Sequence, residues 1–326
     1  MKSEYRVALL TGGAALASIV HAVVYGIDGV PALALVAAAG GPLAIGALAA
    51  GRLDRRFDFR AMLGGGVIGP AVALVSHAAV AAFAYFFLLG FADEATVVLD
   101  ALRVDPRLIE ALQSPWTLVL LVDLAVVAPL TEEIGKGLGG RIARPVDRKS
   151  AFLAGIAAGV GFAVVENVLY VGMGFFFGGP WPEIALLRIF GLAVHPLASG
   201  LVLVGWWDRR HGEDPWALLK GFLAGAGVHA LWNGSIVAIG VVEIAFEFGN
   251  STGSLTTAGF GYLITLGAVL LGALWIATSA VARDGDPVSV IDFSDARIVA
   301  GWVLLMSALL VPATIMVIAF PGFYGG

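Results

Sequence analysis

Long apolar runs, separated by short polar stretches, make up most of this chain. Each run is close to the ~20 residues that an α-helix needs to cross the ~30 Å hydrocarbon core of a bilayer. The pattern therefore predicts an all-α polytopic membrane protein with about nine transmembrane helices. We place these spans at residues 7–25, 30–50, 61–91, 116–140, 151–177, 185–207, 217–240, 259–280 and 298–320.

The composition agrees with this pattern and excludes several classes of protein. Of the 326 residues, 59% are hydrophobic without glycine and 13% are charged, whereas soluble domains have roughly 45–50% with glycine and ~25%. A soluble enzyme and a disordered chain are therefore excluded. There is no cysteine, so a thiol nucleophile, a disulfide and a cysteine-ligated metal are impossible. No basic domain is present, and we expect no nucleic-acid partner.

Basic residues are distributed unevenly between the two sides of the predicted bundle. With the N-terminus in the cytoplasm, all but three of the 19 Lys and Arg residues fall in inner loops or at inner helix ends. Such an excess marks the cytoplasmic side. We therefore expect a multi-pass protein of the plasma membrane with a cytoplasmic N-terminus and the C-terminus outside. The exceptions are Arg103, Arg107 and Arg188.

Polar and ionisable side chains gather in the fourth to seventh spans, whereas the eighth and ninth contain no ionisable residue. A charge at the bilayer centre costs roughly 2.5–3.5 kcal/mol on insertion scales, so a cluster on four consecutive helices indicates a shared interior site. The residues are Asp123, Glu132, Glu133 and Lys136 in the fourth span, Glu166 and Asn167 in the fifth, Arg188 and His195 in the sixth, and His229 and Asn233 in the seventh.

Spacing in the fourth span favours acid–base chemistry. Lys136 follows Glu133 by three positions and Glu132 by four, so it can pair with both carboxylates on one helix face. Two adjacent glutamates repel each other, which favours one neutral and one ionised carboxyl group, as general acid–base catalysis needs. With no cysteine and no Ser–His–Asp pattern, water activated by a carboxylate is the expected nucleophile.

Four short motifs, in order along these spans, resemble those of the PrsW family of intramembrane proteases. They are EExxK from Glu132 to Lys136, FxxxE from Phe162 to Glu166, a mid-helix His195, and HxxxN from His229 to Asn233. The set is more distantly similar to the CAAX-prenyl-protease/bacteriocin-processing superfamily, whose pattern is EExxxR, FxxxH and HxxxN. Glu166 stands where that superfamily has histidine, which favours the PrsW-like interpretation.

The resemblance covers about residues 117–240 and implies a catalytic bundle built from the fourth to seventh spans. We accordingly divide the chain into N-terminal helices with an outer loop (1–115), a catalytic core (116–240) and C-terminal helices (241–326). The implied activity is that of an intramembrane endopeptidase acting on a membrane-anchored protein within the lipid bilayer. A regulatory, anti-sigma-factor-like protein is the kind of substrate that the resemblance suggests.

The residues and the resemblance together assign candidate roles. Either Glu132 or Glu133 is the general base, and the resemblance slightly favours Glu132. Lys136 is their electrostatic partner, and Asn233 is a candidate donor to the oxyanion. The remaining candidates, for positioning water or a metal, are Glu166, His195 and His229.

Two mechanisms stay open at this point. A metal-free glutamic protease needs only the carboxylates and imidazoles, and the sequence slightly favours it because H-E-x-x-H is absent. In a metalloprotease, a single divalent ion such as Zn²⁺ is held by nitrogen and oxygen ligands. The acceptable ligands are Glu133, Glu166, His195 and His229.

The same residue types serve other functions. Intramembrane glutamates and histidines also form proton relays and ion sites, so a proton- or ion-coupled transporter or channel is the main alternative. The chain has no internal repeat, which disfavours an inverted-repeat transporter. A catalytically inactive scaffold that binds partner helices is a third reading.

The remaining polar residues have structural interpretations. We expect Arg188 at the outer interface, Asp123 and Asn167 in structural contacts, His21 and His77 packed between helices, and His211 in solvent. A further expectation concerns depth. The glutamate pair and Glu166 meet only if the fourth helix continues inward to about Ala143, or if the fifth starts deeper, and we predict that the fourth continues.

Overall fold

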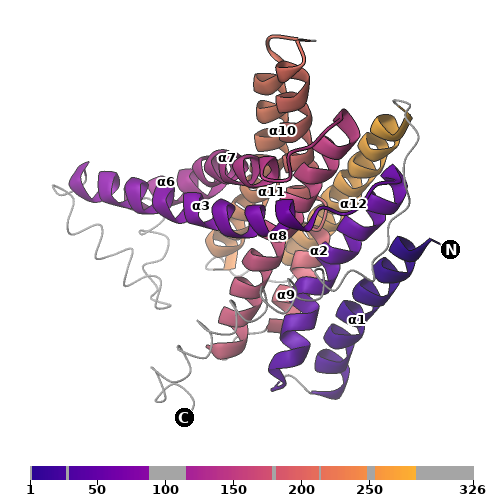
Figure 1. Cartoon of the computed structure of the whole chain (residues 1–326). Helices are drawn as coiled ribbons and strands as arrows, with labels where there is room; N and C mark the ends of the chain where they lie inside the picture. Colours follow the sequence, from indigo (N-terminus) through magenta and orange to yellow (C-terminus); the bar gives the residue numbers. More distant parts are fainter. Residues whose placement is uncertain are drawn as a thin grey trace.

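The computed structural model describes residues 2–26, 29–87, 115–177, 181–212, 214–247 and 254–283. Every regular element in these parts is helical (Figure 1). Seven helical segments there are long and apolar enough to cross a membrane. The chain is therefore a multi-pass helical membrane protein, as the apolar pattern predicts. The ninth predicted span, 298–320, lies outside the described residues, as does the C-terminus.

The helices follow the order of the apolar runs, and each begins or ends within several residues of the predicted boundary. They are α1 (Ser3–Tyr25), α2 (Pro31–Leu53), α3 (Phe59–Phe87), α6 (Pro115–Val122), η2 (Asp123–Val127), α7 (Ala128–Arg141), α8 (Arg148–Phe176), α9 (Trp181–Phe190), α10 (Val194–Arg210), α11 (Ala217–Glu247) and α12 (Ser254–Arg283).

The fourth predicted span departs most from a simple transmembrane helix. It is divided into α6, the π-helical turn η2 and α7, and it is not one of the seven candidate spans. Its three parts are each shorter than a membrane span, and α7 also carries Glu132, Glu133 and Lys136. In η2 the Ala128 N–H bonds to the Asp123 carbonyl, five residues back. Such π-turns often lie at functional sites.

The sixth predicted span is also interrupted. A turn at residues 191–193 separates α9 from α10, although the two helices together are long and apolar enough to form one candidate span. His195 is the second residue of α10, so the interruption falls directly before a candidate site residue.

Helices α3 and α6–η2–α7 lie side by side and run across the other helices (Figure 1). Their backbones approach closely because glycines line the contact: a Cβ on Gly139 of α7 would overlap the Gly64 backbone of α3, and one on Gly135 would overlap Gly69. Small residues commonly permit such contacts between membrane helices. Helix α7 ends at Arg141, two residues before the predicted end at Ala143.

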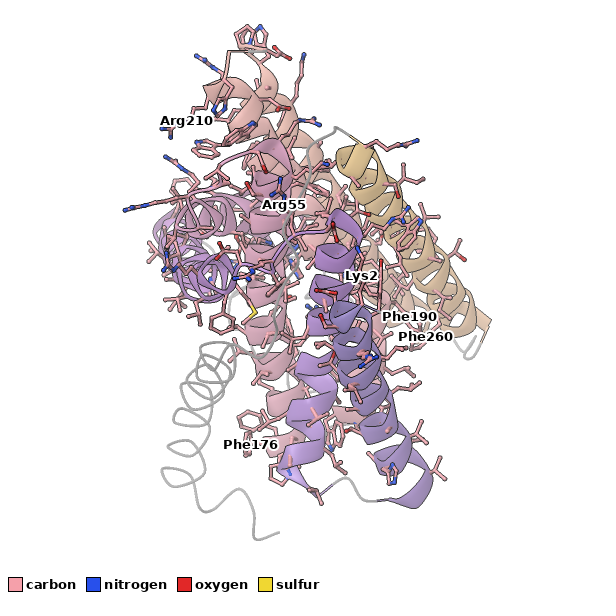
Figure 2. All side chains as sticks on the ribbon, turned by 45° about the vertical axis from the view of Figure 1, so that its right-hand side comes forward. Lys2, Arg55, Phe176, Phe190, Arg210 and Phe260 are labelled. Atoms are coloured by element: carbon pink, nitrogen blue, oxygen red, sulfur yellow. The ribbon has the colours of Figure 1, made fainter. Side chains whose placement is uncertain are left out.

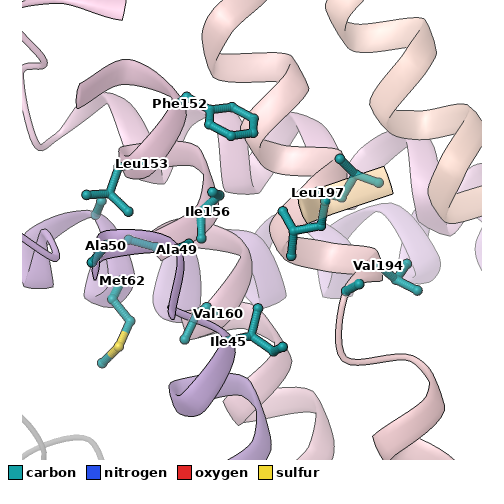
Figure 3. Close-up of a cluster of buried hydrophobic side chains, with 14 of the residues drawn as sticks. Ile45, Ala49, Ala50, Met62, Phe152, Leu153, Ile156, Val160, Val194 and Leu197 are labelled. Carbon is teal, nitrogen blue, oxygen red and sulfur yellow. The ribbon is translucent and has the colours of Figure 1, made fainter. Parts of the chain in front are cut away.

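Helix α8 occupies the centre of the bundle and contacts α2, α3, α7 and α10. Figure 3 shows Ile156 and Val160 of α8 near Ala49 of α2 and Leu197 of α10, all within one buried apolar cluster. Because α8 is covered on all sides, nearly its whole length is apolar. At Gly159 the α10 backbone comes so close that a Cβ would overlap the His195 carbonyl.

Basic residues gather at the end of the bundle where α2, α7 and α10 terminate. Lys2 Nζ lies 2.5 Å from Asp54 Oδ1, and Arg55 forms an ion pair with Asp147, whose side chain also caps the N-terminus of α8. Figure 2 shows Arg210 at this end and Phe176 toward the opposite end. The structure thus places together the loops that the sequence assigns to one side of the membrane.

Candidate active site

Four helices bring six ionisable side chains into one buried group between α7, α8, α10 and α11. Glu133, Lys136 and His229 have no accessible surface, and Glu132 and His195 are almost fully buried. The two imidazole rings lie edge to face with centroids 4.6 Å apart. The structure therefore brings together the candidates of all four motifs, including Glu166. The depth difference is overcome because α7 crosses α8 instead of running parallel to it.

Lys136 lies at the middle of this group. Its Nζ is 2.5 Å from Glu133 Oε1 and 3.6 Å from Glu132 Oε2, the pairs that the spacing indicates. It also lies 3.0 Å from His195 Nδ1 and 4.3 Å from the centre of the Phe162 ring. A side chain so enclosed does not extend to the membrane–water interface. Its positive charge compensates the negative charge of the glutamates.

Each histidine is held by one glutamate. His229 Nδ1 lies 3.1 Å from Glu133 Oε1, and His195 Nε2 lies 2.8 Å from Glu166 Oε2. Because an ionised carboxylate only accepts hydrogen bonds, we assign the proton of His229 to Nδ1 and that of His195 to Nε2. The other nitrogen of each ring then carries a lone pair. Glutamates that orient histidines in this way are typical of metal sites.

Two buried atoms in the group have no hydrogen-bond partner within the described residues: Glu132 Oε2 and His229 Nε2. Unsatisfied buried polar atoms are rare and call for an explanation, such as an ion. Glu132, His195 and His229 each offer one ligand atom, and the three atoms lie within 4.8 Å of one another. Two histidines and one glutamate are a known ligand set of catalytic zinc, so these residues fit a divalent metal.

This set differs from the one expected from the sequence. Glu132 takes the place of Glu133 among the possible ligands. Glu133 and Glu166 instead contact the histidines His229 and His195. Glu133 is fully occupied by Lys136, His229 and the Ser199 hydroxyl, which donates to its Oε2 at 2.9 Å. Adjacent positions on a helix point about 100° apart, and the sequence alone did not decide which glutamate faces the histidines.

Arg188 and Asn167 belong to the same network, although the sequence analysis assigned them to the outer interface and to a structural contact. Arg188 forms an ion pair with Glu166, and its Nε donates to Asn167 Oδ1 at 2.6 Å. Asn167 in turn donates to the Ala38 carbonyl of α2 at 3.1 Å. The expectation that Arg188 lies at the outer interface is therefore wrong. Its place among the polar residues of the fourth to seventh spans was the available signal, since the turn at residues 191–193 breaks the helical spacing between Arg188 and His195.

The structure does not bring Asn233 into contact with the charged group. Its amide donates to the Leu124 carbonyl in η2 at 3.2 Å. The π-turn shifts the backbone hydrogen-bond register there, and a side-chain donor meets one of its carbonyls. A role of Asn233 at the oxyanion is thus left without a supporting contact.

Four other polar residues lie elsewhere. His77, expected as a packing residue, instead pairs with Asp123: its Nδ1 lies 2.6 Å from Asp123 Oδ2. The two face each other across the α3–η2 contact, which the sequence could not show. His21 is exposed on α1, with its Nδ1 2.8 Å from the Ala17 carbonyl. His211 is exposed, as expected, and stacks on Trp207.

With all three carboxylates ionised, the charge of the buried group would not be balanced. Glu132, Glu133 and Glu166 face two cations, Lys136 and Arg188, and both histidines are neutral in the assigned tautomers. Burying an unpaired charge is costly. One additional proton or cation would remove the excess, and the unpartnered oxygen of Glu132 is where it would bind.

A helical membrane protein with a buried Glu–His–His centre has the features of a membrane-embedded hydrolase. The PrsW family intramembrane metalloprotease model matches residues 61–255, more than half of the chain. The chain belongs to this family and is a membrane protease. No curated protein and no solved structure matches it. The match begins at α3, earlier than the motifs, and α3 packs directly on α7 and α8.

Proposed function

We propose that this protease hydrolyses a peptide bond of a membrane-anchored protein at the group formed by Glu132, His195 and His229, and that this group holds a catalytic divalent metal. The observation that carries the proposal is a pair of buried atoms without a hydrogen bond in the described part of the chain, Glu132 Oε2 and His229 Nε2, which face each other at 3.6 Å. With His195 they offer three ligand atoms within 4.8 Å of one another. The family's description as a metalloprotease supports it.

A divalent ion at this site would polarise the scissile carbonyl and make a water molecule acidic enough to lose a proton near neutral pH. The protein itself supplies orientation and charge. Glu133 and Glu166 fix the tautomers, so that the lone pairs are carried by His229 Nε2 and by His195 Nδ1, the latter 3.0 Å from Lys136 Nζ. Lys136 lies between Glu132 and Glu133 and compensates negative charge there.

We also propose Glu132 as the proton acceptor: one of its oxygens would hold the ion and the other would take the proton. Glu133 cannot take this role easily because Lys136, His229 and Ser199 already occupy it. The oxygen of water attacks the carbonyl carbon, and the proton passes through Glu132 to the amide nitrogen as the C–N bond breaks. Carboxylates commonly perform both halves of such a transfer.

Substrate class follows from the place of the site. The group is buried within the helical bundle, so the cleaved protein must approach through or along the bilayer. A single-pass membrane protein fits this requirement, and the resemblance noted from the motifs favours regulatory, anti-sigma-factor-like proteins. Residues 116–240, carrying all the candidates, remain our proposed catalytic core.

The test co-expresses candidate single-pass substrates with the parent and with Glu132→Gln. The parent should release a cleaved fragment, a chelator should stop cleavage by the purified protein, and Zn²⁺ should restore it. Cleavage that resists chelation would favour the metal-free glutamic mechanism. Equal cleavage by both forms would remove this site from the reaction. Proton-coupled uptake without proteolysis, abolished by the same substitution, would instead establish the transporter.

A further inference from the structure

A groove leads from the charged group to the basic end of the bundle. It has a volume of about 550 Å³ and runs between α7, α10 and α11. Glu133 lies at one end of the lining, and Arg141 and Arg209 line the other. Glu133 and Arg141 are eight positions apart on α7, which corresponds to about 12 Å along a helix.

Most of the groove is apolar and faces outward. Ile134, Leu138 and Leu219 line it, and each exposes more than two fifths of its surface. In a membrane protein such side chains meet lipid tails or another membrane segment. The groove therefore offers an apolar path from the side of the bundle as far as Glu133, which borders the buried site.

The basic end of the groove has no acid to neutralise it in the part of the chain that the structure describes. The ion pairs nearby join Arg55 to Asp147 and Arg148 to Asp208, and none involves Arg141 or Arg209. Trp206 lies between Arg141 and Arg210, with guanidinium-to-ring distances of 5.1 and 5.5 Å. Such cation–π contacts hold a guanidinium in place. Figure 2 shows Arg210 at this end of α10.

We infer that this groove binds the membrane segment of the substrate and that Arg141 and Arg209 recognise acidic residues flanking that segment. The inference rests on the proposed peptidase function and adds a substrate class to it. An extended peptide advances about 3.3 Å per residue and a helix 1.5 Å. The acidic residues should therefore lie roughly four to eight positions from the scissile bond.

Two observations favour a substrate segment as the occupant. Arg141 and Arg209 are complementary to acidic flanking residues, and Glu133 of the candidate site lies at the other end of the groove. An anionic lipid headgroup would also suit the two arginines, but it would give no reason for the groove to end at a residue of the candidate active site. A substrate segment explains both ends with one ligand.

The test uses the full-length protein in phosphatidylcholine vesicles with three single-pass model substrates that differ only in an acidic, neutral or basic flank. For the parent we expect kcat/KM to be roughly three- to tenfold higher with the acidic flank, since each exposed ion pair contributes modestly. In R141Q/R209Q the ratio of the kcat/KM values for the acidic and neutral flanks should fall to near one. In R141E/R209E the basic flank should become the preferred one, which also shows that the variant is folded.

R56Q/R60Q is the matched control, because both arginines are exposed and neither lines the groove. It should keep the parent's activity and preference. Equal cleavage of the three flanks by the parent, or an unchanged preference in R141Q/R209Q, would overturn the inference. A response to added phosphatidylglycerol that is independent of the flank and lost in R141Q/R209Q would do so too, and would assign the arginines to lipid.

A binding measurement distinguishes failure of the proposed peptidase function from failure of the groove inference. A photocrosslinking amino acid at Leu138, in an E132Q background, should capture the acidic-flank substrate more efficiently than the neutral one. If no substrate is cleaved by the parent but this difference persists, the groove stands and the proposed chemistry fails. If capture does not depend on the flank, the groove inference is wrong whatever the activity.

Discussion

Glu132 and Glu133 both lie beside Lys136 and His229, but Glu133 is much the closer to both. Their substitution should therefore separate catalysis from stability. Glu132 Oε2 makes no hydrogen bond within the described residues, so Glu132→Gln should change the unfolding free energy by less than about 1 kcal/mol. Glu133→Gln leaves Lys136 with weaker compensation and should cost about 3–5 kcal/mol, as removal of one partner of a buried pair does.

Thermal unfolding in detergent and the cleavage assay measure both effects. Glu132→Gln should lower kcat by at least ~10²-fold, the usual contribution of an acid–base group, while unfolding near the parent temperature. Equal destabilisation by the two substitutions would contradict the assignment of Glu133 as the structural partner of Lys136.

Arg188 should act as a positioning residue. It pairs with Glu166, which holds His195, and it is anchored through Asn167 to α2. Arg188→Gln should therefore lower metal affinity by roughly 10–100-fold, as loss of an outer partner of a ligand typically does. Arg188→Lys should recover only part of it, because a lysine cannot donate in two fixed directions.

Titration with Zn²⁺ measures this affinity directly and does not depend on turnover. The exposed Arg60, replaced by Gln, serves as the control and should leave the affinity unchanged. Unaltered metal binding in Arg188→Gln would show that the arginine stabilises the bundle without orienting the site.

At this scale the sequence supplied the residue types but not their partners. Charges in apolar spans identified every member of the buried group, because the cost of burying them limits where they occur. Which nitrogen faces which carboxylate depends on helix rotation, which no spacing within one helix defines. Arg188 was misplaced because its partner Glu166 lies on another helix, and His77 because Asp123 does.

Among the helices, the crossing of α8 and α10 sets the position of His195, and glycines permit it: Gly155 lies against Ser199 and Gly159 against His195. A Cβ on Gly159 would overlap the His195 carbonyl, so Gly159→Ala must move α10. We expect a loss of about 1–3 kcal/mol, typical of overpacking, together with loss of cleavage. Gly227 of α11 has open space around it, and Gly227→Ala should be neutral or slightly stabilising.

Unfolding and cleavage measured on the two alanine variants decide this point. If Gly159→Ala retained full activity, the contact between α8 and α10 would not control the site.

The sequence predicted the helices well and their arrangement poorly. Apolar length alone locates α1, α2, α8 and α12, because the bilayer requires it. The fourth segment was read as one regular span, since its hydrophobic pattern does not reveal the π-turn at Asp123 or the division into α6 and α7. The crossing of α3 and α7 over α8 depends on glycine contacts between segments far apart in the chain, such as Gly65 with Ala158.

For the molecule as a whole, the concentration of basic residues at one end predicts that this end faces the cytoplasm. Because the chain has no cysteine, single cysteines can report the sidedness without background. Val146, 80% exposed between α7 and α8, lies at the basic end, and Gly29 lies in the turn between α1 and α2 at the other end (Figure 1).

A membrane-impermeant maleimide should label Gly29→Cys in intact cells and Val146→Cys only after permeabilisation. The cysteine-free parent controls for labelling of other groups, and cleavage activity shows that each variant is correctly inserted. The reverse labelling pattern would place the N-terminus outside. It would contradict the orientation predicted from the distribution of arginine and lysine residues.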